Sequence, residues 1–208
     1  MFRLVLNMNT DLENLPLFPL SLFLLPGEQT HLHIFEPRYR ELVQRVKSSD
    51  DQLFGIPYFV KHNHKLGSLV KLVDVVKEYP SGEKDILVEG VAIFELKGYN
   101  RKSQDRPFPS GKVKIRDHYK TWMADRCVKR EFTKLKKAFD QPIVSDSEDL
   151  KIPILTVLAF LNLSSSDKYN FLSGNDFPRQ EEQLLNMIKF TRLIAQQERR
   201  KEFNFYMN

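Results

Sequence analysis

The feature that most constrains the fold of this chain is an apolar run near its start, from Leu15 to Leu20, that prolines interrupt. Pro16 and Pro19 lack the amide proton that a helix requires, and each biases the residue before it toward extended backbone. The run therefore predicts an edge strand. After a short crossing segment, Glu36 and Pro37 predict the start of a helix, because proline is tolerated at the first helical position.

The middle of the chain has the pattern of β-strands. Extended runs are expected over residues 53–60, 67–76, 85–96 and 112–119. The second run places apolar residues on both faces, so we expect it to be covered on both sides. Pro80 to Gly82 predicts the turn after it, and Gly90 predicts a bulge or a close backbone approach. Short strands of this kind favour a small, partly closed barrel.

The period becomes helical from Trp122 onward. A first helix is predicted by apolar residues that recur three or four positions apart, namely Ala124, Val128, Phe132, Leu135 and Phe139. Further helices are expected over 154–163, from Ser164 through Leu172, and from Pro178 to about Lys201. The chain is thus predicted to be α+β, with a barrel subdomain over 1–121 and a helical bundle subdomain over 122–208.

Several of these segments resemble the Lon protease N-terminal domain family. The resemblance is carried by Leu15-Pro16-Leu17-Phe18-Pro19-Leu20, Leu24-Leu25-Pro26-Gly27 and Ile34-Phe35-Glu36-Pro37-Arg38-Tyr39, and more diffusely by 67–72, 88–91 and 161–172. It implies a PUA-like pseudo-barrel of short, mostly antiparallel strands followed by a C-terminal helical bundle. It also implies a substrate-recognition role in proteolysis. One departure is Ile93, where the family commonly has an arginine three residues after the strand glycine.

The catalytic parts of full-length Lon proteases are not predicted here. A phosphate-binding P-loop needs glycines followed by a lysine and a hydroxyl residue. The only Gly-Lys pair is Gly111-Lys112, with Arg106 where the first glycine should stand and Val113 where the hydroxyl should stand. The chain is therefore predicted to be a stand-alone, non-enzymatic module without ATPase or protease domains and without a cofactor.

Two histidine pairs and one cysteine are the candidate reactive or metal-binding groups of the chain. His31 with His33, and His62 with His64, place two imidazoles on one face of an extended segment, a spacing that can ligate zinc. Nothing in the sequence brings the two pairs together, so we expect solvent-facing histidines and no metal site. Cys127, next to the apolar stripe of the first predicted bundle helix, is expected to be a small core residue, because no partner base is near it in sequence.

Aromatic residues in the proline-interrupted strands suggest a polypeptide-binding groove. An edge strand offers free backbone donors and acceptors to an extended chain, and apolar pockets beside it accept alternate side chains. Phe18, Phe23, Tyr58 and Phe59 are the candidate peptide-binding residues, and a place in the core is the alternative for each. The expected ligands are unfolded or partner polypeptides, including a protease, in proteolysis or quality control.

Nucleic acid is the alternative ligand. Lys112, Lys114 and Arg116 alternate along one predicted strand, the chain carries a formal net charge of +5, and PUA-like folds include RNA binders. An RNA-binding PUA-like adaptor is therefore the second hypothesis. Its alternative is that these basic side chains simply face solvent and bind nothing.

The composition predicts a cytoplasmic protein. No stretch approaches the roughly 20 apolar residues of a membrane helix, and Asn7 and Asn9 lie where a signal peptide would stay apolar. The single cysteine agrees with a reducing compartment.

Overall fold

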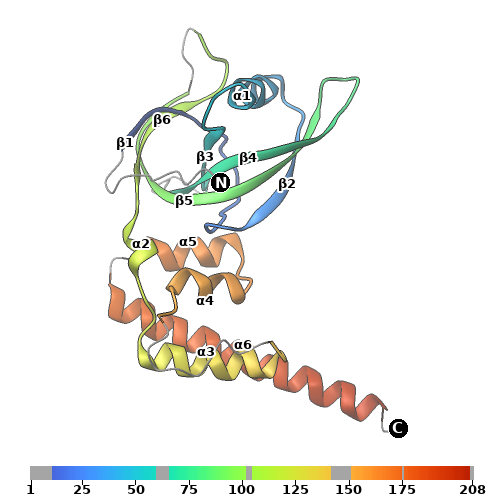
Figure 1. Cartoon of the computed structure of the whole chain (residues 1–208), viewed down its shortest axis with the longest axis vertical. Coiled ribbons are helices and arrows are strands. Elements are labelled where there is room, and N and C mark those ends of the chain that lie inside the picture. Colours follow the sequence, from blue (N-terminus) through green and yellow to red (C-terminus); the bar gives the residue numbers. More distant parts are fainter. Residues whose placement is uncertain (1–10, 60–65, 102–104, 142–150, 175, 207–208) are drawn as a thin grey trace. The chain divides into compact units, whose positions relative to one another are not determined.

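The structure is a computed structural model that describes residues 11–59, 66–101, 105–141, 151–174 and 176–206. It divides into two compact units, Met1–His118 and Tyr119–Asn208. The first unit, here called the barrel unit, contains a curled antiparallel sheet and one packed helix, and the described elements of the second, the helical unit, are helices (Figure 1). The predicted α+β class is confirmed.

The described strands of the barrel unit form a single sheet in the order β1-β6-β5-β4-β3, with β2 paired to β5. After β1, Leu17 and Leu20 make parallel bridges to Gly55 and Tyr58, which joins the two ends of the strand order. This seam closes the barrel, as the short strands predicted. The elements are β1 (Asp11–Pro16), β2 (Gln29–Ile34), α1 (Pro37–Lys47), β3 (Leu53–Pro57), β4 (Leu66–Glu78), β5 (Lys84–Asn100) and β6 (Ser110–Ile115).

The opening run is extended, as its prolines predicted, but the regular strand stops at Pro16 and starts earlier, at Asp11. The crossing segment was predicted incorrectly, because it contains the strand β2. In β2 the exposed side chains of His31 and His33 alternate with the partly covered side chain of Leu32. That alternation is typical of an edge strand with one covered face, and β2 finds its partner in the first half of β5.

Helix α1 starts as predicted, with Glu36 in extended backbone and Pro37 in the first turn. Its apolar stripe is buried and consists of Tyr39, Leu42, Val43 and Val46. These side chains form one core with residues of the opening run and the sheet, among them Phe18, Phe54 and Ile86. The helix is therefore fixed to the barrel along its whole length.

Strand β4 is covered on both faces only in its first half. Leu69 and Val70 are fully buried, whereas Val73 and Val76 are 45% and 52% exposed. The expectation of burial on both sides is wrong for the second half, because register shifts after Leu72 re-aim the side chains. The turn that follows was predicted correctly, with Gly82 at a φ of 85°.

Gly90 marks a close backbone approach. Its amide donates to the Glu28 carbonyl at 2.9 Å, and its carbonyl accepts from the Gly27 amide at 2.8 Å. A Cβ atom on Gly90 would collide with the Leu25 carbonyl, so only glycine fits here without a shift of the backbone.

The strand predicted over 112–119 is shorter than expected, because β6 ends at Ile115 and a short helix follows. Tyr119 is buried in that helix, and its hydroxyl donates to the Leu172 carbonyl. The helices are α2 (His118–Thr121), α3 (Arg126–Ala138), α4 (Ile154–Phe160), α5 (Ser165–Ser173) and α6 (Phe177–Tyr206).

In the helical unit, α3 packs along α6 (Figure 1). Asp125 caps α3 by accepting from the Val128 amide at 2.7 Å, and Ser164 caps α5, as its sequence predicted. Cys127 is exposed, so its expected place in the core is wrong. The buried stripe runs through Val128 and Phe132, and the preceding helical position points about 100° away from it. Among the residues that the structure describes, no helix is long and apolar enough to cross a membrane.

Candidate functional site

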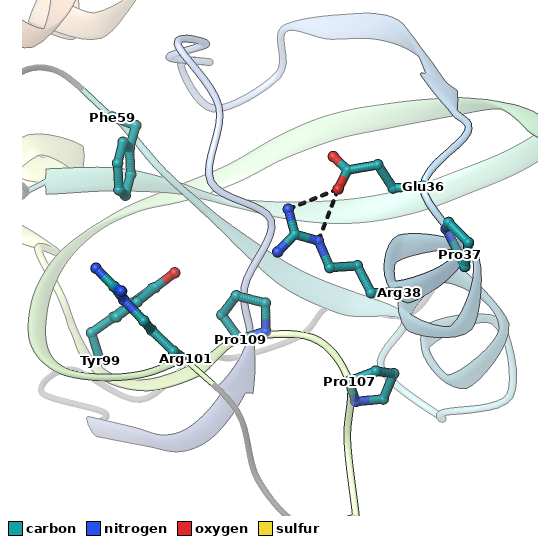
Figure 2. Close-up of a pocket in the computed structure, with 8 residues that line it drawn as sticks. All are labelled: Glu36, Pro37, Arg38, Phe59, Tyr99, Arg101, Pro107 and Pro109. Carbon is teal, nitrogen blue, oxygen red and sulfur yellow. Dashed lines mark hydrogen bonds and ion pairs between the residues drawn. The ribbon is translucent and has the colours of Figure 1, made fainter.

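A pocket of about 780 Å³ opens on the barrel unit where the start of α1 faces the end of β5 (Figure 2). Its volume falls within the range of about 300–1,000 Å³ that small-ligand and side-chain pockets occupy. The lining residues are Glu36, Pro37, Arg38, Phe59, Tyr99, Arg101, Pro107 and Pro109.

The first turn of α1 supplies one wall of the pocket. Glu36 precedes the helix, and its side chain makes no hydrogen bond to the helix amides that it could cap. Its carboxylate instead accepts from Arg38, at 2.9 Å from Nε and 2.7 Å from the terminal nitrogen (Figure 2). The Arg38 guanidinium also lies 4.6 Å from the centre of the buried Tyr39 ring. These contacts fix the Arg38 side chain beside the pocket.

Phe59 stands at the opposite side of the pocket, two residues beyond β3 (Figure 2). Its amide donates to the Leu20 carbonyl at 3.0 Å, and its carbonyl accepts from the Ser21 hydroxyl at 3.3 Å. The backbone is thus held in the closing seam of the barrel while the ring stays 46% exposed. A large aromatic ring on a fixed backbone is a low-entropy contact surface for a ligand.

Tyr99 and Arg101 come from the end of β5 and the residues after it. Tyr99 lies opposite Gly111 of β6, and 37% of its surface is exposed. Partial burial raises the pKa of the Tyr99 hydroxyl above 10.0, although the nearby charges of Arg101 and Arg38 act in the other direction. Both guanidinium groups are therefore electrostatically close to this hydroxyl.

Two prolines complete the pocket from the loop before β6. Pro107 is half-buried and Pro109 is buried, and the Pro109 carbonyl accepts from the Leu17 amide at 2.8 Å. Because proline has a fixed φ and no amide donor, this wall is rigid and presents mainly apolar surface.

The pocket lining combines apolar surface with charged groups. Aromatic and proline surfaces can accept an apolar side chain, and two guanidinium groups stand against the single carboxylate of Glu36. The lining residues contain no nucleophile beside a base, the pairing that covalent catalysis requires.

The four predicted peptide-binding residues fall into two groups. Phe18, Phe23 and Tyr58 are buried, with at most 7% of each exposed, so they occupy the core that was their alternative. Phe59 alone lines the pocket. Peptide binding by these residues remains a prediction.

Most of the pocket was missed in the sequence. Tyr99 and Arg101 adjoin a polar loop without periodicity, and their exposure cannot be read from the residue types. The two prolines of that loop, Pro107 and Pro109, were the available signal, since a rigid loop is suited to shape a site.

The basic strand that is predicted to bind nucleic acid lies beside carboxylates from neighbouring strands. The Lys112 ammonium lies 2.5 Å from the Glu13 carboxylate, and Arg116 lies 3.3 Å from that of Glu95. Lys114 is exposed between them. Two of the three basic side chains therefore form ion pairs with carboxylates of the same chain. The nucleic-acid interface remains a prediction.

His31 and His33 lie on β2 with exposed side chains, and His33 Nδ1 is 2.7 Å from the Asp85 carboxylate. His62 and His64 lie outside the described residues. No group of three or more metal-ligating side chains occurs in the parts of the chain that the structure describes.

Two solved structures and one family model match this chain over most of its length. A Lon N-terminal domain protein from Xanthomonas campestris is 24% identical with a TM-score of 0.61, and the match covers 85% of this chain and 98% of that one. The N-terminal domain of the Mycobacterium avium complex Lon protease is 14% identical with a TM-score of 0.53, over the same shares. These identities support the fold alone. No curated protein matches the chain.

The family model of the ATP-dependent protease La (LON) substrate-binding domain matches residues 14–189, which include the barrel strands from the end of β1 onward, the pocket and much of the helical unit. Because this match covers well over half of the chain, the protein belongs to the LON substrate-binding domain family.

Proposed function

We propose that the barrel unit binds extended segments of other polypeptides in the pocket between α1 and the end of β5. The observation that carries this proposal is the pair of exposed aromatic side chains, Phe59 and Tyr99, on the wall of a cavity of about 780 Å³. Membership of a family described as the substrate-binding domain of an ATP-dependent protease supports a polypeptide ligand.

The shape and surface of the pocket suit a side chain of an extended segment. Phe59, Pro107 and Pro109 offer apolar contact surface on backbone that is already ordered, so little conformational entropy is lost when a ligand binds. Tyr99 adds a ring with a polar hydroxyl, a combination common in sites that accept several different partners. Such a site selects apolar side chains without a strict sequence requirement.

The proposed role is a non-enzymatic one. The bound segments would belong to unfolded or partner polypeptides in proteolysis or quality control, and the predicted cytoplasmic location is consistent with such partners. Phe59 is the single residue that the sequence hypothesis and the pocket share.

The experiment that tests this function measures binding of a reduced, carboxymethylated model protein and of short peptides containing one phenylalanine by isothermal titration calorimetry. Phe59→Ala should weaken binding about tenfold, because the exposed part of the ring is a contact surface. Tyr99→Ala should weaken it to a similar degree.

The matched control is Phe190→Ala, which removes an aromatic ring that is 65% exposed on α6 in the helical unit. Binding by this variant should equal that of the unmodified protein. Equal losses of affinity in Phe59→Ala and Phe190→Ala, or no binding by the unmodified protein, would refute the proposal that this pocket is the binding site.

A further inference from the structure

We propose that this pocket selects polypeptide segments in which a carboxylate stands beside the bound apolar side chain, with Arg101 and Arg38 as the carboxylate-binding residues. The inference rests on the proposed function and adds the chemical class of its ligand. It depends on the balance of charges around the cavity.

Arg101 is the pocket cation without a carboxylate partner among the described residues, and it is exposed at the wall of the pocket. Arg38 has one carboxylate partner there, Glu36, and both of its contacts with Glu36 go to the same carboxylate oxygen. Two guanidinium groups and one carboxylate therefore give the lining a net charge of +1, which an anionic ligand would neutralise.

Glu36 indicates where a ligand carboxylate would lie. Its side chain makes no capping contact with α1 and is 40% exposed. Its carboxylate instead forms an ion pair with Arg38, with 2.7 Å between the carboxylate oxygen and a guanidinium nitrogen. Figure 2 shows this ion pair at the edge of the same cavity that Phe59 and Arg101 border. Glu36 thus acts as an internal competitor, which an incoming carboxylate can displace or join.

The apolar part of the ligand fits the apolar surface of the same pocket. Phe59, Pro107 and Pro109 supply this surface, and the Tyr99 hydroxyl lies near both guanidinium charges. A segment with an apolar side chain and a nearby carboxylate would use both the apolar and the charged lining residues. The carboxylate can come from an aspartate or glutamate side chain or from the free carboxyl end of a chain.

The test uses matched peptides in calorimetric titrations with the protein containing both units. One pair contains a phenylalanine followed two residues later by glutamate or by glutamine, with both ends blocked. A second pair ends two residues after the phenylalanine, either in a free carboxylate or in an amide. The first pair tests a side-chain carboxylate and the second tests a terminal one.

The unmodified protein should bind the glutamate peptide about fivefold more tightly than the glutamine peptide, since partly exposed charge pairs contribute modestly. Arg101→Gln should abolish this preference, so that the glutamate and glutamine peptides bind equally, and Arg101→Lys should retain part of it. Glu36→Gln should increase the affinity for the glutamate peptide about twofold or more, because the competitor is removed. Raising the salt concentration should reduce the preference.

The control for net charge is Arg126→Gln, which removes one exposed arginine from the start of α3. It should leave the preference intact. Equal affinity of the unmodified protein for acidic and amide peptides would overturn the inference and leave the proposed function standing, provided that Phe59→Ala still weakens both peptides. Failure of all four peptides to bind would overturn the proposed function and this inference together.

Discussion

The rings of Phe18 and Tyr39 lie 4.3 Å apart, measured between their centres, and this contact joins the opening run of the chain to the buried face of α1. Both side chains are buried, with 7% and 6% exposed. The contact therefore belongs to the core, and the neighbouring Arg38 and Glu36 present the pocket wall from its outer side.

Phe18→Ala is expected to lower the free energy of unfolding of the barrel unit by about 3–5 kcal/mol, the usual cost of removing a buried phenylalanine. Phe59→Ala, at a half-exposed position, is expected to cost less than about 1 kcal/mol. Urea denaturation followed by circular dichroism measures both. Equal losses in the two variants would contradict the separation of core and pocket.

Gly90→Ala should destabilise the barrel unit by about 1–3 kcal/mol, because the added Cβ meets the Leu25 carbonyl and the backbone must shift. The matched variant is Gly98→Ala in the same strand, where the nearest atom is the Lys112 Cβ at 3.6 Å. Ordinary contact at that distance predicts a change within about 0.5 kcal/mol. The midpoints of thermal unfolding compare the two, and a larger loss in Gly98→Ala would show that the close approach is misassigned.

Glu131 connects α3 to α6 through its carboxylate, which lies 2.7 Å from Lys134 and 3.3 Å from Arg192. The hydrogen bond from Lys134 is the main cause that holds the pKa of the Glu131 carboxyl below 4.5, and burial acts against it. Since the folded pKa is depressed, the stabilisation is complete above the unfolded value and is lost as the pH falls below 4.5 toward the folded pKa.

Glu131→Gln should therefore lower the free energy of unfolding of the helical unit by about 1–3 kcal/mol at pH 7. The deficit relative to the unmodified protein should shrink as the pH is lowered through the acid range. Denaturation curves at pH 7 and below pH 4 measure the difference, and a constant deficit at both would argue against the linkage.

Asp85 links the edge strand β2 to the β4–β5 turn. Hydrogen bonds from His33 and then Tyr79, whose hydroxyl lies 2.7 Å from the carboxylate, hold the pKa of Asp85 below 3.8. Tyr79→Phe should raise this pKa toward 3.8, as followed by NMR titration of the side-chain carboxyl carbon. Glu78, whose pKa is lowered by Lys84, is the internal control and should not move.

The sequence predicted the parts of the fold that depend on local rules. Pro37 predicted the start of α1 because its φ is fixed, and Gly82 predicted the turn after β4 because glycine readily adopts a positive φ. Ser164 predicted the cap of α5 because its hydroxyl can accept from a helix amide. Strand β2 was not predicted because its short, mostly polar run has a strand pattern that becomes recognisable only from its pairing with β5, which is distant in sequence. Cys127 was misplaced by a single helical position.

The pocket depends on tertiary placement, and so the sequence predicted little of it. Phe59 and its neighbour Tyr58 are both aromatic, yet just beyond the end of β3 one is exposed and the other lies in the core. Arg101 and Arg38 line the same pocket only because the end of β5 comes back beside the first turn of α1, and no local pattern contains that information.

The seam that Leu17 and Leu20 form with Gly55 and Tyr58 has a consequence for biosynthesis. Strand β1 pairs with β6, whereas the residues just after β1 bridge to β3 and Tyr58. The opening run therefore has one partner that is synthesised early and one that is synthesised late. As the nascent chain leaves the ribosome, residues 11–20 can dock on β3 long before β6 is synthesised. Until then, the edge of β1 that pairs with β6 remains unpaired. The prolines at positions 16 and 19 have no amide proton, so this run offers fewer free donors to other chains before the barrel closes.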